Sequence, residues 1–166
     1  MRLRARRLTR EVRLAARAFA AVILTGPRRS GKTTLLRQVF PTASYHLLED
    51  PEVVARLRAD PRTFLDEIRL PAILAEIQHA PEILNHIRAR IDRAPRETGR
   101  WLLTGSQEAP LMRGVTESMA GRAAVLQLLP FSSAEHPAVS VLRGGFPEPL
   151  ARPRAASLWF RSYLQT

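Results

Sequence analysis

The chain has 166 residues and a formal net charge of +11, with 45% hydrophobic and 25% charged residues, the ordinary composition of one globular domain. The absence of cysteine excludes disulfides and thiolate metal sites, and no apolar run approaches the roughly 18 residues of a membrane-spanning helix. These features predict a single-domain protein of the reducing cytoplasm without a membrane span.

The first predicted element is a basic amphipathic helix within residues 1–18. This segment contains seven arginines and a single acidic residue, Glu11, and apolar residues recur between the arginines. Such a helix suits a nucleic-acid backbone, an anionic membrane surface or an acidic protein, and its composition is also that of an organelle transit peptide. A solvated helix that leads into the first strand explains the same pattern. Nucleic acid and an acidic protein therefore remain open as partners of this segment.

A glycine-rich loop follows the next predicted element, an apolar strand over residues 19–25, and precedes a helix over residues 34–40. The loop fits the phosphate-binding pattern G-x-x-x-x-G-K-[ST] and reads Gly26-Pro27-Arg28-Arg29-Ser30-Gly31-Lys32-Thr33-Thr34. Because strand, loop and helix are the setting that this motif requires, we interpret residues 26–34 as a P-loop and not as a chance glycine turn.

Each part of this loop has a chemical task. Gly26 and Gly31 permit backbone conformations in which successive N–H groups converge on a phosphate. Lys32, the one lysine among 26 basic residues, is expected to reach the β- and γ-phosphates, and the Thr33 hydroxyl is expected to bind Mg²⁺. The two arginines within the loop are expected to face solvent or nucleotide. We therefore predict that residues 26–34 bind the phosphates of a nucleotide together with Mg²⁺.

Strands and helices alternate through the rest of the core. Strands are predicted over residues 44–48, 71–78, 101–106 and 123–129. Helices are predicted to begin at Pro51, at Pro61 with Asp60 as its cap, at Pro81, and at about Pro110, the last ending at Met119. This alternation predicts an α/β fold, a P-loop NTPase with a parallel sheet of about five strands and helices on both faces. A ligand then belongs at the carboxyl ends of the strands, where the P-loop lies.

The pattern weakens after Pro130 into loops that contain glycine and proline, and the chain ends in a helix-like segment over residues 155–165. That segment carries five large apolar side chains: Leu158, Trp159, Phe160, Tyr163 and Leu164. This is too much apolar surface for a free tail. We expect it to fold back on the domain or to pack on a segment that the chain lacks.

These motifs resemble those of the bacterial and archaeal AAA-type P-loop ATPases that carry a C-terminal domain of unknown function. The matching segments cover nearly the whole chain: Leu24–Arg28, the P-loop, Ile73–Gln78, Leu102–Ser106, Leu111–Val115, Met119–Arg122, Arg143–Glu148 and Trp159–Leu164. The resemblance implies an AAA-like core over residues 19–135 that binds Mg²⁺ and ATP, with ATP hydrolysis as the ancestral reaction. It also implies that residues 136–166 are a remnant of the link to a missing second domain.

The resemblance assigns catalytic roles to three residues. Glu76 is expected to orient the attacking water, Ser106 to sense the γ-phosphate, and Arg122 to contact that phosphate in the same chain or from a neighbouring subunit. The alternatives are that Glu76 is an exposed residue at a strand end, that Ser106 is a helix N-cap, and that Arg122 has no special role in an arginine-rich chain.

One position departs from the family pattern. The third strand of these ATPases ends in Asp-Glu, whose aspartate helps to hold Mg²⁺, and here the first of the two positions is Ala75. An alanine cannot accept a hydrogen bond from a metal-bound water, so Mg²⁺ would depend on Thr33, the phosphates and solvent. Nucleotide binding is expected to persist, whereas hydrolysis is expected to be impaired by orders of magnitude.

Other functions fit the same residues. The chain could be a nucleotide-gated module that binds DNA or protein without turnover, or a degenerate fragment of a longer ATPase. A small P-loop kinase is a further alternative, although no lid is evident. AAA-like domains often assemble, so an oligomer is possible. The four histidines show no metal-ligand spacing.

Overall fold

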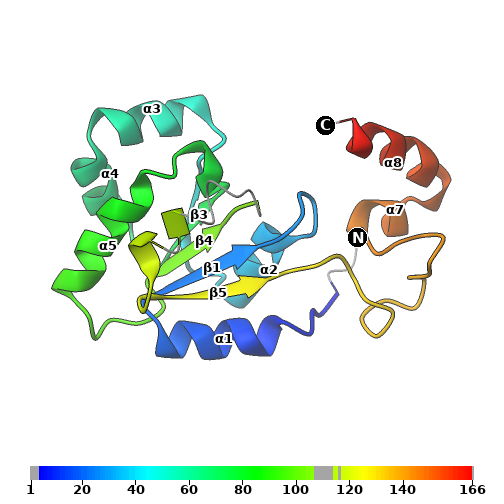
Figure 1. Cartoon of the computed structure of the whole chain (residues 1–166), viewed down its shortest axis with the longest axis horizontal. Helices are drawn as coiled ribbons and strands as arrows, with labels where there is room; N and C mark the ends of the chain where they lie inside the picture. Colours follow the sequence, from blue (N-terminus) through cyan, green and yellow to red (C-terminus); the bar gives the residue numbers. More distant parts are fainter. Residues whose placement is uncertain (1–3, 107–113, 116, 166) are drawn as a thin grey trace.

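The computed structural model describes residues 4–106, 114, 115 and 117–165 of the chain (Figure 1). Its elements are α1 (Thr9–Ala18), β1 (Ala21–Thr25), α2 (Lys32–Val39), β2 (Ser44–Leu47), α3 (Pro51–Ala59), α4 (Pro61–Glu67), β3 (Ala72–Ala75), the 3₁₀ helix η1 (Ile77–His79), α5 (Ile83–Arg93), β4 (Trp101–Thr104), β5 (Ala123–Gln127), α7 (Pro147–Ala151), η2 (Pro153–Ala155) and α8 (Ala156–Leu164). Residues 114, 115 and 117–119 are also helical, and the rest of the helix predicted from Pro110 lies outside the described residues.

The strands form one parallel sheet of five strands in the order β2-β3-β4-β1-β5. The predicted α/β fold is confirmed. Because β1 lies between β4 and β5, the loop that follows β1 emerges beside the carboxyl ends of both neighbours (Figure 1). This is the edge of a parallel sheet at which ligands bind.

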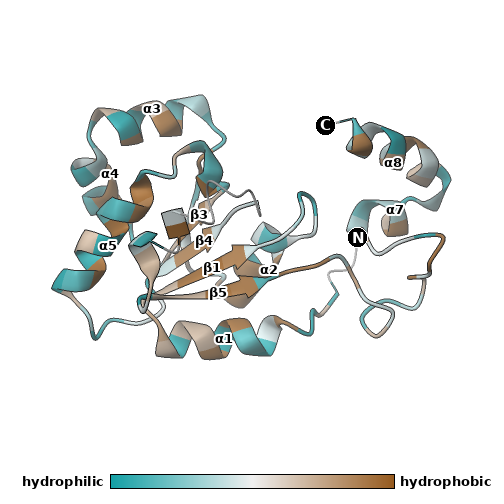
Figure 2. Cartoon of the chain, viewed as in Figure 1, coloured by the Kyte–Doolittle hydropathy of each residue, from teal (hydrophilic) through white to brown (hydrophobic). Residues whose placement is uncertain are grey.

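Helices cover both faces of the sheet, and side chains that alternate along each strand supply the two halves of the core. Helices α1 and α2 pack on one face, where the buried cluster contains Val12, Ala16, Val22, Leu24, Leu35, Leu36, Ile73, Leu102 and Leu128. Helices α3, α4 and α5 pack on the other face, against Ile23, Leu74 and Leu103. Figure 2 shows largely hydrophobic strands between helices that contain both hydrophobic and hydrophilic residues.

The strand lengths follow burial. Strands β1, β3 and β4 are buried at every position, as continuous apolar runs in a parallel sheet should be. Several strands are shorter than predicted. The run over residues 71–78 leaves the sheet after Ala75, because Glu76 adopts a left-handed conformation (φ 61°) and Ile77 begins a 3₁₀ turn. Helix α2 begins at Lys32, earlier than the predicted residue 34.

Aspartate caps position two helices on the α3–α5 side. Asp50 accepts a hydrogen bond from the Glu52 backbone N–H at 2.9 Å, and Asp60 accepts from the backbone N–H groups of Arg62 and Thr63 at 3.1 Å. The cap predicted at Asp60 is confirmed, and a proline follows each capping residue in the first turn.

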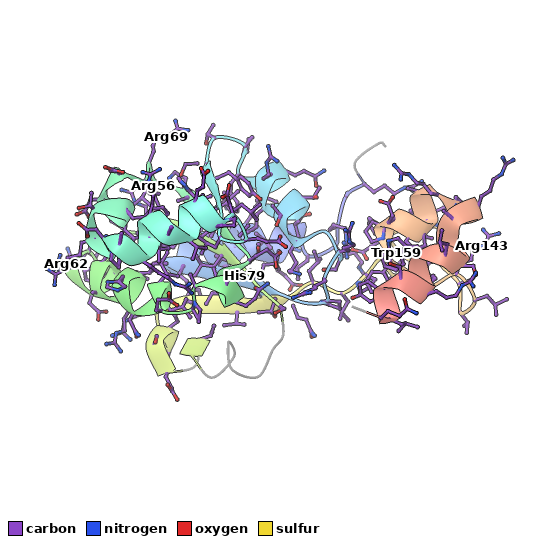
Figure 3. The ribbon with its side chains drawn as sticks, turned by 90° about the horizontal axis from the view of Figure 1, so that it is seen from above. Arg56, Arg62, Arg69, His79, Arg143 and Trp159 are labelled. Atoms are coloured by element: carbon purple, nitrogen blue, oxygen red, sulfur yellow. The ribbon has the colours of Figure 1, made fainter. Side chains whose placement is uncertain are left out.

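The C-terminal segment forms a small helical hairpin at the end of the molecule near the P-loop (Figure 1; Trp159 is labelled in Figure 3). Its four aromatic side chains, from Phe146, Trp159, Phe160 and Tyr163, pack on one another. The Tyr163 hydroxyl donates to the Arg28 carbonyl oxygen at 3.3 Å, so the segment folds back toward the loop. Among the described helices, none is both long enough and apolar enough to cross a membrane.

Candidate functional site

The glycine loop between β1 and α2 is built on two backbone conformations that side chains resist. Gly26 has φ 142°, and a Cβ placed there would lie 2.2 Å from the Leu128 carbonyl oxygen. Gly31 has φ 96° and is the residue that caps α2. A larger residue at Gly26 would therefore collide with the chain that leaves β5, while Gly31 supplies the left-handed turn into the helix.

The loop delivers backbone donors to one place. Helix α2 begins directly after Gly31, at the carboxyl end of the sheet, and the N–H groups of its first turn have no partners within the helix. These groups and the helix dipole favour an anion at this end of α2. The loop thus brings the N-terminus of α2 to the carboxyl edge of the sheet.

Lys32 lies inside this loop and is only 4% exposed. Its ammonium donates to the carbonyl oxygens of Gly26 at 3.1 Å and Pro27 at 2.9 Å. Burial lowers the pKa of Lys32, and the nearby Glu76 carboxylate opposes part of that shift. A bound phosphate would favour the charged ammonium in the same way as Glu76 does.

Glu76 and Ser106 lie close together because they follow the carboxyl ends of the paired strands β3 and β4. The link between them is Gln78, whose side-chain amide donates to the Glu76 carboxylate at 2.7 Å. The side-chain oxygen of Gln78 accepts a hydrogen bond from the Ser106 backbone N–H at 3.2 Å. Thr104 completes the network because its hydroxyl oxygen accepts from the Glu76 backbone N–H at 3.2 Å.

Gln78 and Thr104 were not identified from the sequence. Glu76 owes its position to an uncommon left-handed conformation for a residue with a side chain, and such conformations cluster at functional sites. The signal in the sequence was a polar residue, Gln78, directly after the apolar Ile77.

Ala75 is the last residue of β3, at the position where the family pattern has an aspartate that helps to hold Mg²⁺. It is fully buried, and it shares a sheet face with Ile73, which packs against Leu35 and Leu36 of α2. Thr33, half-buried in the first turn of α2, offers a hydroxyl ligand on that side. The described residues contain no group of three or more acidic or histidine side chains that could hold a metal by themselves.

Arg122 lies at the opposite edge of the sheet. It immediately precedes β5, and its carbonyl oxygen accepts from the backbone N–H of Ala21 at the start of β1. Its guanidinium forms a two-bond ion pair with Asp92, at 2.6 and 3.0 Å. This pairing lowers the pKa of the Asp92 carboxyl. Arg122 therefore does not approach the P-loop of its own chain, and a role in a neighbouring subunit stays a prediction.

A pocket opens beside the first turns of α2, against the P-loop. Its lining residues come from the loop, from α2 and from other segments of the chain: Ser30, Gly31, Thr34, Leu35, Gln38, Arg4, Arg6, Phe131 and Pro147. Its walls combine apolar, aromatic and hydrogen-bonding groups, the usual lining of a site for a small organic ligand. The sequence had not indicated that residues 131 and 147 would reach this place.

Comparison with known proteins agrees with this arrangement. The model of a protein family described as "AAA domain" matches residues 18–136. Two curated proteins, one uncharacterized protein from Mycobacterium bovis and one from Mycobacterium tuberculosis, are each 35% identical to the chain over 119 residues. These alignments cover 70% of this chain and 26% of each relative. The chain thus spans about a quarter of the length of the curated relatives it matches.

Proposed function

Because the chain belongs to the AAA domain family of ATPase-like nucleotide-binding domains, we propose that it binds ATP with Mg²⁺ on residues 26–34 and hydrolyses it slowly. The observation that carries the proposal is the buried ammonium of Lys32 inside a glycine loop at the carboxyl edge of the sheet. A buried lysine at the start of a helix is suited to a phosphate anion. We also propose residues 19–135 as the nucleotide-binding core, which the family match over residues 18–136 supports.

In this proposal each residue acts on one part of the nucleotide. The loop N–H groups and Lys32 hold the β- and γ-phosphates, and Thr33 is the protein ligand of Mg²⁺. The metal, when bound, neutralises charge that develops on the phosphates. Glu76 orients the attacking water, with its carboxylate held by Gln78, and Ser106 lies at the adjacent strand end.

We place the base end of the nucleotide in the pocket beside α2. Ser30, Gly31 and Thr34 of the P-loop line that pocket, so a nucleotide whose phosphates lie on residues 26–34 can extend into it. Gln38 offers hydrogen bonds to a base edge, and Phe131 and Pro147 offer apolar contact.

Titration of the purified protein with a fluorescent ATP analogue, with and without Mg²⁺, tests nucleotide binding directly. We expect saturable binding that unlabelled ATP displaces. A protein that unfolds cooperatively and yet shows no saturable binding would reject the proposal and favour the degenerate-fragment alternative.

Glu76→Gln is expected to separate binding from hydrolysis. The substitution keeps the side chain's size and removes the charge that orients water, so steady-state hydrolysis should fall about tenfold or more. Affinity for the ATP analogue should change less than about threefold, because Glu76 lies beyond the loop that holds the phosphates. Glu49→Gln, at an exposed carboxylate after the edge strand β2, is the matched control. Equal hydrolysis in Glu76→Gln and wild type would remove Glu76 from the mechanism.

A second candidate function rests on the outer face of α1. Arg10, Arg13 and Arg17 are exposed, and their spacing of three and four residues places them along one side of the helix. In the described part of the chain none of them pairs with a carboxylate, whereas Arg58 and Arg90 on the other side do. We propose that this face binds a nucleic-acid backbone, the extended polyanion that an arginine row fits.

Replacing Arg10, Arg13 and Arg17 with glutamine should weaken binding to a DNA duplex and reduce its salt dependence. The slope of log K against log salt should decrease in magnitude by about 3, roughly 0.9 for each lost phosphate contact. A second triple variant at exposed arginines of the opposite side changes the net charge equally: Arg56, Arg62 and Arg69 (Figure 3). The same loss in both triple variants would mean that net charge, and not α1, binds DNA.

A further inference from the structure

Arg6 is buried against the P-loop, unlike the exposed arginines that surround it in the sequence. It is 8% exposed, whereas Arg4, Arg7 and Arg10 are exposed. Its guanidinium donates to the Ser30 carbonyl oxygen at 2.9 Å, to the Leu129 carbonyl oxygen, and through Nε to Glu135 at 3.2 Å.

Two further contacts fix this guanidinium in place. Its carbon lies 4.3 Å from the centre of the Phe131 ring, within the range of a cation–π contact. Glu135 is itself anchored, because it also accepts from the Arg7 backbone N–H at 2.8 Å and from the Ser132 backbone N–H at 3.0 Å. Although burial would raise the pKa of Glu135, these hydrogen bonds and the Arg6 charge hold it below its usual value. The partner of Arg6 is therefore a fixed, ionised carboxylate.

The contact with Ser30 determines where a neighbouring N–H group points. A trans peptide is planar, so the Ser30 carbonyl and the Gly31 N–H point in opposite directions. Arg6 holds the Ser30 carbonyl, which leaves the Gly31 N–H directed away from Arg6. Gly31 is the last loop residue before α2 and the left-handed conformation at this position sets the orientation of that peptide.

We propose that Arg6 is a positioning residue of the nucleotide site. Its guanidinium orients the Ser30–Gly31 peptide so that the Gly31 N–H faces the bound phosphate, and it joins the loop to the segment that follows β5 through Leu129 and Glu135. The proposal rests on the proposed function, because the Gly31 N–H is taken to bind a nucleotide phosphate. Arg6 precedes the residues that match the family model, so the family match does not account for it.

The test compares wild type with Arg6→Gln, Arg6→Lys and the control Arg96→Gln, at an exposed arginine far from the P-loop in the sequence. We expect Arg6→Gln to weaken binding of ADP and of the ATP analogue about tenfold or more, since charge-assisted hydrogen bonds to buried acceptors are the strong ones. Arg6→Lys should lose most of the same affinity, because an ammonium keeps the charge but cannot reach three acceptors arranged around a planar fork. Arg96→Gln should change affinity less than about twofold.

Hydrogen exchange of the P-loop amides, measured without nucleotide, gives an independent readout. Amides within residues 29–32 should exchange faster in both Arg6 variants than in wild type and Arg96→Gln, with exchange in β1 and β4 unchanged. If Arg6→Gln does not fold, Glu135→Gln, which keeps Arg6 and loosens its anchor, should show a smaller change in the same peptides.

Three results would overturn the inference: wild-type affinity in Arg6→Gln, full recovery by Arg6→Lys, or unchanged exchange across residues 29–32. Recovery by lysine would mean that charge alone acts. Failure of the wild type to bind nucleotide would instead reject the proposed function, while faster loop exchange in the variants would still establish that Arg6 orders the loop.

Discussion

Lys32→Ala is expected to abolish measurable binding of ATP and ADP, with a loss of affinity of about a hundredfold or more. Lys32 is the basic side chain enclosed by the loop, and hydrogen bonds from a charged donor to phosphate contribute roughly 1.5–3 kcal/mol each. Two such bonds account for that factor, since about 1.4 kcal/mol is tenfold. Fluorescence titration of both nucleotides measures the loss, and thermal unfolding verifies that the variant folds.

The control for Lys32→Ala is Arg37→Ala, which removes a positive charge at an exposed position of α2, outside the loop. Its affinity should remain within about threefold of wild type, because an exposed charge acts through high-dielectric solvent. Equal losses in the two variants would show that general positive charge, and not an enclosed ammonium, attracts the nucleotide.

The pH dependence of binding follows from the same group. Burial lowers the pKa of Lys32 from the ordinary 10.5, so the ammonium deprotonates at a lower pH than a free lysine. Phosphate binds the charged ammonium of Lys32. The affinity for nucleotide is therefore highest below the lowered pKa and decreases as pH rises through it. An ADP titration series over increasing pH should show this decrease in wild type, at a lower pH than the ordinary lysine pKa of 10.5.

Ala75→Asp is expected to raise Mg²⁺-dependent ATP hydrolysis by about ten- to a hundredfold, since a positioned charged group near the reacting phosphates is commonly worth such factors. The side chain at position 75 lies on the α2 side of the sheet, where Thr33 begins the helix. A carboxylate there can accept hydrogen bonds from water bound to Mg²⁺, which alanine cannot. Phosphate release at saturating ATP, with and without Mg²⁺, measures the gain.

The matched control for this gain is Ala75→Asn, which adds similar volume at a fully buried position without the charge. It should leave hydrolysis near the wild-type rate. Unfolding of each variant must be measured, because a polar group placed at a buried site costs stability unless it is hydrogen-bonded. A folded Ala75→Asp protein that binds nucleotide and hydrolyses it no faster would show that the missing aspartate does not limit the rate.

Local sequence patterns predicted the order and type of most elements. The apolar runs of β1, β3 and β4 identified central strands because strands covered on both faces need apolar side chains throughout. The G-x-x-x-x-G-K-T spacing located the loop, because the motif is contiguous and its geometry depends on its own backbone. The resemblance to AAA-type ATPases is likewise confirmed by the family match over residues 18–136.

The sequence by itself therefore determined the α/β class, the alternation of elements and the place of the loop, all of which depend on neighbouring residues. Only the tertiary structure decided which distant groups meet. It placed Arg122 at the amino edge of the sheet beside Asp92, and it joined Gln78 to Ser106 across two strands. It also buried Arg6 against Ser30, whereas the neighbouring N-terminal arginines are exposed. Contacts between residues so far apart depend on the direction and packing of whole strands and helices, which periodicity along one chain does not encode.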